Sequence, residues 1–191
     1  VAAPFTGTSL GDALGNSDIT FTQNTGTSNG NGGVYRYWVA AGSASWSATT
    51  SWSTSSGGAS GASVPLPHDT VIFDSGSGSG TRTVTCDMPR LGADIDLGSI
   101  SAGAVTLTNS TPNTVYGSLT LASNTTPSGT NTLTLSPRSS KTLTSAGRTF
   151  TQAVVIDAPG GTITLQDAFT DSRAGVVSLT VNKGTFDAND F

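Results

Sequence analysis

Apolar and polar residues alternate in short segments over most of the second half of the chain. Segments such as RTVTCDM, AVTLTN, NTLTLS and GTITLQDA place Val, Leu or Ile at every second position, with Thr between them. This alternation is typical of β-strands that bury one face. Stretches that form turns, among them NSTPN, NTTPSG, SPRSS, APGG and VNKG, separate the segments at intervals of about 10 to 15 residues. The sequence therefore predicts an all-β protein built from short Thr-rich strands.

Two architectures fit this pattern. Stacked coils would form a β-solenoid-like domain, and antiparallel hairpins would form an elongated β-sandwich domain. The spacing alone leaves both open, and an extended N-terminal arm precedes the strands in either case. The residues predicted to face inward are Leu107, Leu119, Leu121, Leu133, Leu135, Leu143, Phe150, Ile163, Leu165, Leu179 and Val181.

Changes in composition divide the chain into three regions. Residues 1–33 are poor in large apolar side chains and end in NTGTSNGNGG, which is typical of an arm or tether. Residues 34–80 are a Trp-rich capping segment, and residues 81–191 are the β-strand repeat domain. In the arm we expect a strand around residues 19–22 that pairs with a neighbouring subunit, and we expect the scattered apolar residues to dock on a partner. These residues are Phe5, Leu10, Ile19 and Phe21.

All three tryptophans lie in the second region, among Ser, Thr, Gly and Ala. Trp38, Trp46 and Trp52, with Phe73 from the strand-like DTVIFD, supply buried area that the short side chains around them cannot supply. We interpret these four residues as a structural cap on the strand ladder, because an uncovered end would leave an edge prone to aggregation. The alternative is that exposed tryptophans stack on the sugars of a host-surface glycan.

Charge and composition exclude several classes of protein. Charged residues make up 10% of the chain, all 12 acidic residues are Asp, and the net charge is -4. Nucleic-acid binding needs clustered Lys and Arg, and a membrane-spanning helix needs a run of about 20 apolar residues. The sequence has neither feature, so we expect no nucleic-acid partner and no membrane insertion. The one cysteine, Cys86, is expected to be a buried thiol.

Two arrangements of ionisable residues are candidates for catalysis. Asp94 and Asp96 are two residues apart and would share one face of a strand, as paired carboxylates in a glycan-cleaving enzyme would. A solvated edge or a turn explains the same pair. His68 is the only histidine, and its neighbour Asp69 is better explained as the start of a strand than as the group that orients a catalytic base. We therefore assign no catalytic residue and expect no enzyme activity.

The acidic C-terminal segment FDAND is a candidate metal site. Asp187, Asn189 and Asp190 offer oxygen ligands, but the segment lacks the glycine and the distal carboxylate of a calcium loop. A polar turn accounts for these residues. We assign no metal site and no cofactor.

The order of several motifs resembles a known family. YWV is followed by W, then WS, SGGASGASVP and DTVIFD, and later by GSLTL, GRTF, GGTITLQDAFT and GTFDAND. This order, over about residues 35–191, resembles a module common in structural proteins of tailed phages and prophages. The chain departs from the family pattern at Ala40 and Ala41, where Gly-Gly is usual, and at Ile163, where an aromatic residue is frequent. It also stops at Phe191, where the family continues with further strands.

The resemblance implies a virion structural protein, made in the host cytoplasm and placed on the virion surface. It implies a capsid decoration or cement protein, or a head fibre, docked by its N-terminal arm to the major capsid or tail protein, and a homotrimer. The alternative is a tail-fibre or adhesin-type module, extracellular and bound to a host glycan.

Overall fold

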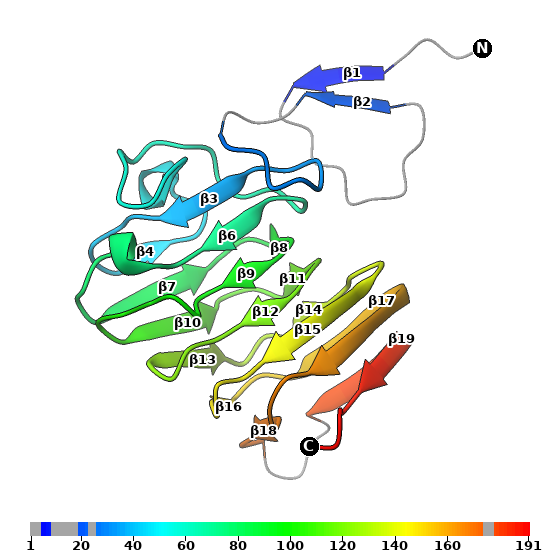
Figure 1. Ribbon diagram of the computed structural model, residues 1–191. Coiled ribbons are helices and arrows are strands. Elements are labelled where there is room, and N and C mark those ends of the chain that lie inside the picture. The colour runs from blue at the N-terminus through cyan, green and yellow to red at the C-terminus, as the bar shows by residue number, and fades with distance from the viewer. Residues whose placement is uncertain (1–4, 9–18, 23–25, 174–177) are drawn as a thin grey trace.

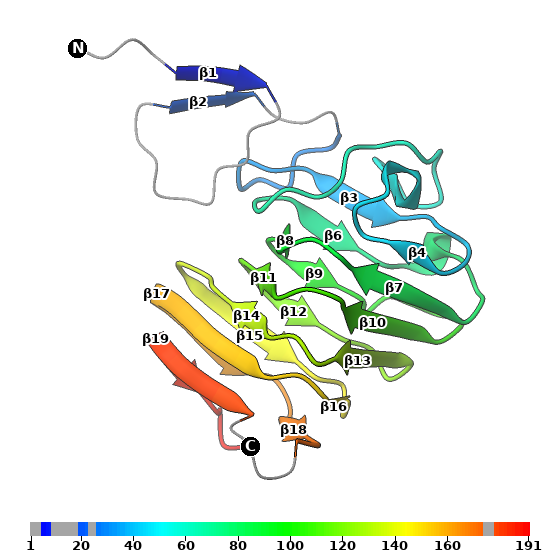
Figure 2. The ribbon, with the colours of Figure 1, turned by 180° about the vertical axis from the view of Figure 1, so that it is seen from behind.

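The protein is a parallel β-solenoid of about five turns. The computed structural model describes residues 5–8, 19–22, 26–173 and 178–191. Strands make up 44% of the structure and helices 4%. Figures 1 and 2 show the strands stacked along one axis, with β3 near one end and β19 at the other. The all-β prediction is confirmed, and of the two expected architectures the structure has the stacked coils.

One face of the solenoid is a sheet with the strand order β13-β10-β7-β4. Its strands are β4 (Ala44–Ser45), β7 (Arg82–Cys86), β10 (Val105–Asn109) and β13 (Thr125–Gly129). All three pairings are parallel. Two later strands, β16 (Thr149–Phe150) and β18 (Thr170–Asp171), form a separate parallel pair. Pro127 lies within β13 and has no N–H to donate, which accounts for the end of the four-stranded ladder at this strand.

A larger sheet supplies the rest of the wall. Its path is β5-β3-β6-β9-β12-β15-β17-β14-β11-β8. The strands are β3 (Tyr35–Trp38), β5 (Trp52–Ser53), β6 (Thr70–Ile72), β8 (Arg90–Gly92), β9 (Ile95–Asp96), β11 (Asn113–Val115), β12 (Leu119–Thr120), β14 (Leu133–Leu135), β15 (Ser140–Thr144) and β17 (Val154–Leu165). The first part of β17 pairs with β14 and its last part with β15, so this strand turns a corner of the solenoid. Among the paired strands of the described residues, β3 and β5 alone are antiparallel, and a single antiparallel bridge joins Ser28 to Val34 before β3.

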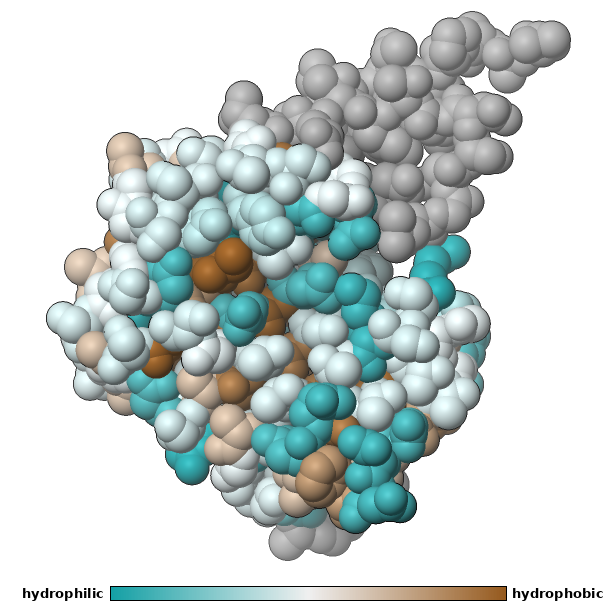
Figure 3. Space-filling model, viewed as in Figure 1, coloured by the Kyte–Doolittle hydropathy of each residue, from teal (hydrophilic) through white to brown (hydrophobic). Residues whose placement is uncertain are grey.

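The interior is filled by the alternate residues that the sequence pattern indicated. In β10, for example, Val105 and Leu107 are buried, and the threonines between them are only partly buried. Leu107 lies in register with Val84 in one neighbouring strand and with Pro127 in the other. Because equivalent residues of successive coils stack in this way, each coil covers the apolar face of the one before it. Figure 3 shows one outer face of the molecule. Most of this face is pale, which marks intermediate hydropathy, because Ser, Thr and Gly are abundant in this chain.

Three of the segments expected to be turns belong to strands instead. NTTPSG contributes β13, APGG lies inside β17, and VNKG lies inside β19 (Leu179–Asp187). Gly160 and Gly184 have φ angles of 73° and 83°, so glycine lets the backbone bend there without ending the strand. In a solenoid the corners of successive coils can keep their parallel pairing. Turn chemistry in the sequence therefore marks corners as well as strand ends.

The last coil differs from the expectation of a fully covered interior. Strand β19 pairs with β17 on one side, and within the described residues no strand lies on its other side. Val181 lies in register with the fully buried Ile156, yet 47% of Val181 is exposed. Leu179 is only partly buried. No further coil among the described residues covers these two predicted interior residues.

Candidate functional site

The four aromatic residues predicted to form a cap are buried and in mutual contact. Trp38 lies in β3, Trp52 in β5, and Trp46 and Phe73 in adjoining loops, and all four have 0% exposure. Trp38 stacks on Phe73 at 5.4 Å between ring centroids, and Trp46 meets Trp52 edge-on at 4.8 Å. Such pairs contribute beyond their buried area. No tryptophan therefore offers a free face on which a sugar could stack.

Hydrogen bonds fix this aromatic cluster from within. The indole N–H of Trp52 donates to the Trp46 carbonyl oxygen at 2.7 Å, and that of Trp38 donates to the Ala40 carbonyl oxygen at 3.0 Å. The indole N–H of Trp46 finds no partner among the described residues. Trp46 also lines a small interior space of about 20 Å³ with Cys86 and other residues of the solenoid core. The cluster is thus continuous with the first coils of the stack, where a cap would lie. Its role as a cap stays a prediction.

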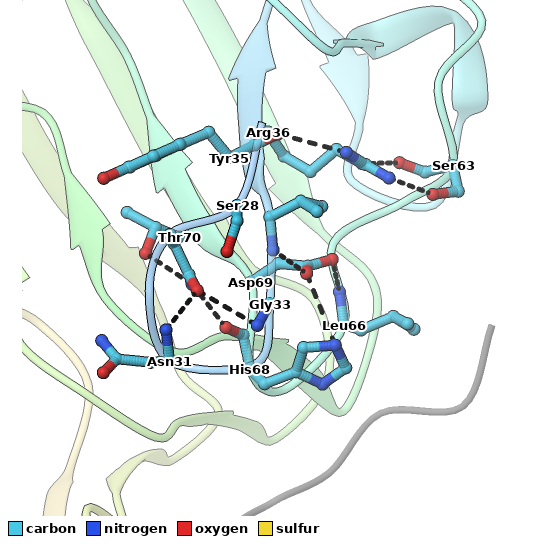
Figure 4. Close-up of polar contacts among 12 residues, drawn as sticks. Ser28, Asn31, Gly33, Tyr35, Arg36, Ser63, Leu66, His68, Asp69 and Thr70 are labelled. Atoms are coloured by element: carbon cyan, nitrogen blue, oxygen red, sulfur yellow. Dashed lines mark hydrogen bonds and ion pairs between the residues drawn. The ribbon is translucent and has the colours of Figure 1, made fainter. Parts of the chain in front are cut away.

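The buried carboxylate of Asp69 joins the segment before β3 to the segment before β6. Its two oxygens accept hydrogen bonds from the backbone N–H groups of Val34, at 3.0 Å, and Leu66, at 2.9 Å. His68 Nε2 lies 3.6 Å from Asp69 Oδ1. Figure 4 shows the Asp69 carboxylate facing Leu66 and His68. Asp69 therefore acts as a structural acceptor that holds two loops together.

A second set of contacts positions residues 29–33 over the same loop. The Asn29 side chain donates to the His68 carbonyl oxygen at 2.7 Å and accepts from the backbone N–H groups of Asn31 and Gly33. A Cβ atom at position 33 would overlap the His68 carbonyl group, so only glycine fits there. In Figure 4 the side chain of Asn31 points away from this network. The backbone of Asn31 is thus held by Asn29, and the side-chain amide of Asn31 lies at the surface.

Arg36 ties β3 to the glycine-rich loop that follows β5. Its side chain is fully buried and donates to the backbone and side-chain oxygens of Ser63, at 3.0 and 2.8 Å. Burial lowers the pKa of the Arg36 guanidinium, and the negative charge of Asp69 opposes that shift. The GGASGASVP segment is thereby anchored to β3.

The N-terminal arm contains a short parallel pair, β1 (Phe5–Thr8) and β2 (Ile19–Thr22). Phe5 pairs with Ile19, and Gly7 pairs with Phe21. Figure 1 draws this pair beyond β3, apart from the stacked coils. The pair forms a two-stranded sheet of its own within the described structure. Three of the four predicted docking residues thus occupy alternate positions of one small sheet, and Leu10 lies outside the described residues.

A polar hollow of about 90 Å³ lies at one corner of the solenoid. It is lined by Asn31, Pro67, His68, Ala93, Asp94, Tyr116, Ser136, Arg138, Ser139 and Lys141. The Asp94 carboxylate receives the Lys141 ammonium at 2.8 and 3.1 Å and the Ser118 backbone N–H at 2.7 Å. Gly117 permits this approach, because a Cβ atom there would overlap Asp94. Residues from several coils therefore meet in one small concave surface.

The two carboxylates that are candidates for catalysis take different roles. Asp94 belongs to the ion pair with Lys141, whereas Asp96 accepts a hydrogen bond from the Gly98 backbone N–H at 2.7 Å. Each is engaged locally, and the structure does not join them in one shared hollow. These contacts explain both residues structurally.

The metal candidates at the C-terminal end are organised as a turn. Asp187 Oδ1 accepts from the Asn189 backbone N–H at 3.0 Å, and the Asn189 amide donates to the Leu165 carbonyl oxygen at 3.1 Å. Within the ranges that the structure describes, no group of three His, Cys, Asp or Glu side chains is placed to hold a metal ion. The same ranges contain no helix that is long and apolar enough to span a membrane.

Sequence reasoning missed the hollow, although the sequence holds a signal for it. Asp94, Tyr116 and Arg138 follow one another at intervals of 22 residues. Register pairs such as Val115 with Gly92 and Leu119 with Ile95 show that one coil is about this long. Had the coil length been known, the three residues could have been assigned to the same corner of successive coils.

Comparison of the chain with models of known families, with curated proteins and with solved structures found no match.

Proposed function

We propose that the protein is a structural component of a phage virion, of the capsid decoration, cement or head-fibre type. Its N-terminal arm docks on another virion protein, and its solenoid stabilises or decorates the particle surface. The resemblance over residues 35–191 supports this family, and the −4 net charge fits a protein that does not contact packaged nucleic acid. The same resemblance supports a homotrimer.

The observation that carries the proposal is the isolated β1–β2 pair. A two-stranded sheet is at best marginally stable in water, and parallel sheets are found almost always with both faces covered. Phe5 and Ile19 occupy one paired position of the sheet, and Phe21 lies two residues beyond Ile19. A partner surface that adds strands to this pair and covers its apolar positions would make it stable. The arm therefore suits docking better than it suits an independent fold.

The test uses particles from a strain that carries the gene, purified after prophage induction from the intact strain and from a strain with the gene deleted. Wild-type protein should co-sediment with the deleted particles and raise the temperature at which they release DNA. The Phe21→Ser variant should fold normally but fail to bind. Val181→Ser, at the far end of the solenoid, is the matched control and should bind as wild type. Finding the protein only as free chains in the medium, with no binding to the particles, would refute the proposal.

A further inference from the structure

We propose that the hollow at the solenoid corner binds a carboxylate-bearing sugar. The proposal is independent of virion assembly, because it rests on residues of the solenoid corner and can be tested on the free protein. The hollow combines cations, one anion and an aromatic ring within about 90 Å³. That combination matches an acidic sugar, which offers one carboxylate, several hydroxyl groups and one weakly polar ring face.

Charge is the first argument. Arg138 and Lys141 supply two positive charges and Asp94 one negative charge, so these three residues give the hollow a net charge of +1 in a chain whose net charge is −4. Arg138 is exposed and makes no hydrogen bond or ion pair within the described residues. A free guanidinium recognises carboxylates through two parallel hydrogen bonds. The hollow therefore favours an anion that reaches Arg138.

The fixed position of Asp94 is the second argument. Lys141 contacts both oxygens of this carboxylate, and the Ser118 N–H contacts one of them. Carboxylate oxygens carry about four lone-pair sites in total, so Asp94 can still accept hydroxyl protons. An ordered carboxylate accepts sugar hydroxyls well, but it repels a ligand whose only polar groups are anionic. This distinguishes an acidic sugar from a simple inorganic anion.

Tyr116 and Asn31 complete the arrangement. Tyr116 is partly buried, and its hydroxyl group makes no hydrogen bond in the part of the chain that the structure describes. Tyrosine combines an apolar ring for the sugar face with a polar end that can donate or accept. Asn31 is held over the hollow by the contacts of Asn29 and presents its amide at the rim. The hollow thus has the Tyr116 ring surface, the anion-binding Arg138, and polar groups of Asp94, Asn31 and Tyr116 that can bind sugar hydroxyls.

The experiment titrates the free full-length protein with D-glucuronate, with D-glucose and with inorganic phosphate, observed by ¹H–¹⁵N correlation NMR. Glucuronate should shift the amide signals of residues that line the hollow, with an affinity in the range of about 1 mM, which is typical of a single small contact site. Glucose should bind at least about tenfold more weakly, because it lacks the charge-assisted contact. The binding should also weaken as salt concentration rises.

Variants separate the site from a general charge effect. Arg138→Ser should weaken glucuronate binding about tenfold or more, and Tyr116→Ala should weaken glucuronate and glucose alike. Arg90→Ser removes another exposed arginine, one that does not line the hollow, and it should leave binding unchanged. The proposal is overturned if glucuronate shifts no lining residue, if glucose or phosphate binds as well as glucuronate, or if Arg138→Ser and Arg90→Ser behave alike.

Discussion

The aromatic cluster gives the sharpest test of the structure, through truncation of Trp46. This side chain is fully buried, and its ring centroid lies 4.8 Å from that of Trp52 and 6.2 Å from that of Phe73. Replacing a buried aromatic residue by alanine lowers the free energy of unfolding by about 3–5 kcal/mol. A whole domain is stable by only about 5–15 kcal/mol. Trp46→Ala should therefore remove a large part of the stability of this end of the solenoid.

Trp46→Phe is the matched control. The indole N–H of Trp46 makes no hydrogen bond in the described structure, so phenylalanine keeps an aromatic ring and leaves no polar group newly unpaired. We expect a loss below about 2 kcal/mol, from the reduced ring volume alone. Both variants remove the indole N–H, and only Trp46→Phe keeps an aromatic ring. The difference between their free energies of unfolding therefore measures the contribution of the ring contacts.

Urea unfolding should be followed by tryptophan fluorescence and by far-ultraviolet circular dichroism. All three tryptophans lie in the cluster, so fluorescence reports on that end of the molecule, whereas circular dichroism reports on all coils. Coils contact only their neighbours, so damage at one end should open that end first. In Trp46→Ala the fluorescence midpoint should fall below the circular dichroism midpoint. The assignment of these rings as a cap would be wrong if the free energy of unfolding from fluorescence were within about 0.5 kcal/mol of wild type in Trp46→Ala. It would also be wrong if Trp46→Ala and Trp46→Phe lost the same free energy of unfolding.

Three further outcomes are expected. Gly33→Ala should lower the free energy of unfolding by about 1–3 kcal/mol, because its Cβ would meet the carbonyl group of His68. The control Gly42→Ala, whose Cβ would have open space around it, should be close to neutral. Equal melting temperatures for the two variants would contradict this. In urea titrations, Ile156→Ala should lower the free energy of unfolding by about 2–5 kcal/mol. Val181→Ala, at the matching position of the last described coil, should lower it by less than about 1 kcal/mol. A loss at Val181 as large as at Ile156 would show that this coil is covered in solution. Burial raises the pKa of the Cys86 thiol to about 12, with the negative charge of Asp87 adding to the shift. A disulfide reagent at pH 8 should therefore label Cys86 only after unfolding, and the free energy of unfolding should fall as pH rises from about 8.5 towards 12. Rapid labelling of the native protein would contradict this.

The candidate sites show where sequence reasoning stopped. Burial of the three tryptophans follows from their isolation among small residues, since few other side chains in that segment can form a core. The roles of Asp69 and Arg36 could not be read in the same way. Asp69 bonds to Val34, 35 positions away, and Arg36 bonds to Ser63, 27 positions away. An isolated charged residue in a sequence does not reveal which distant backbone groups will need it as a partner.

Local chemistry determined most of the strands of this protein, and the pairing between coils determined which residues meet and where strands continue through a corner. Alternation of Thr with Leu, Val and Ile is enough to make strands with one apolar face, because a strand turns successive side chains to opposite sides. Whether those strands pair with the next segment or with the next coil is not local, since the same alternation satisfies both arrangements. Parallel stacking brought Asp94, Tyr116 and Lys141 to one corner and left Val181 without cover. Those outcomes depend on which segment each strand pairs with in the next coil, and that pairing belongs to the tertiary structure.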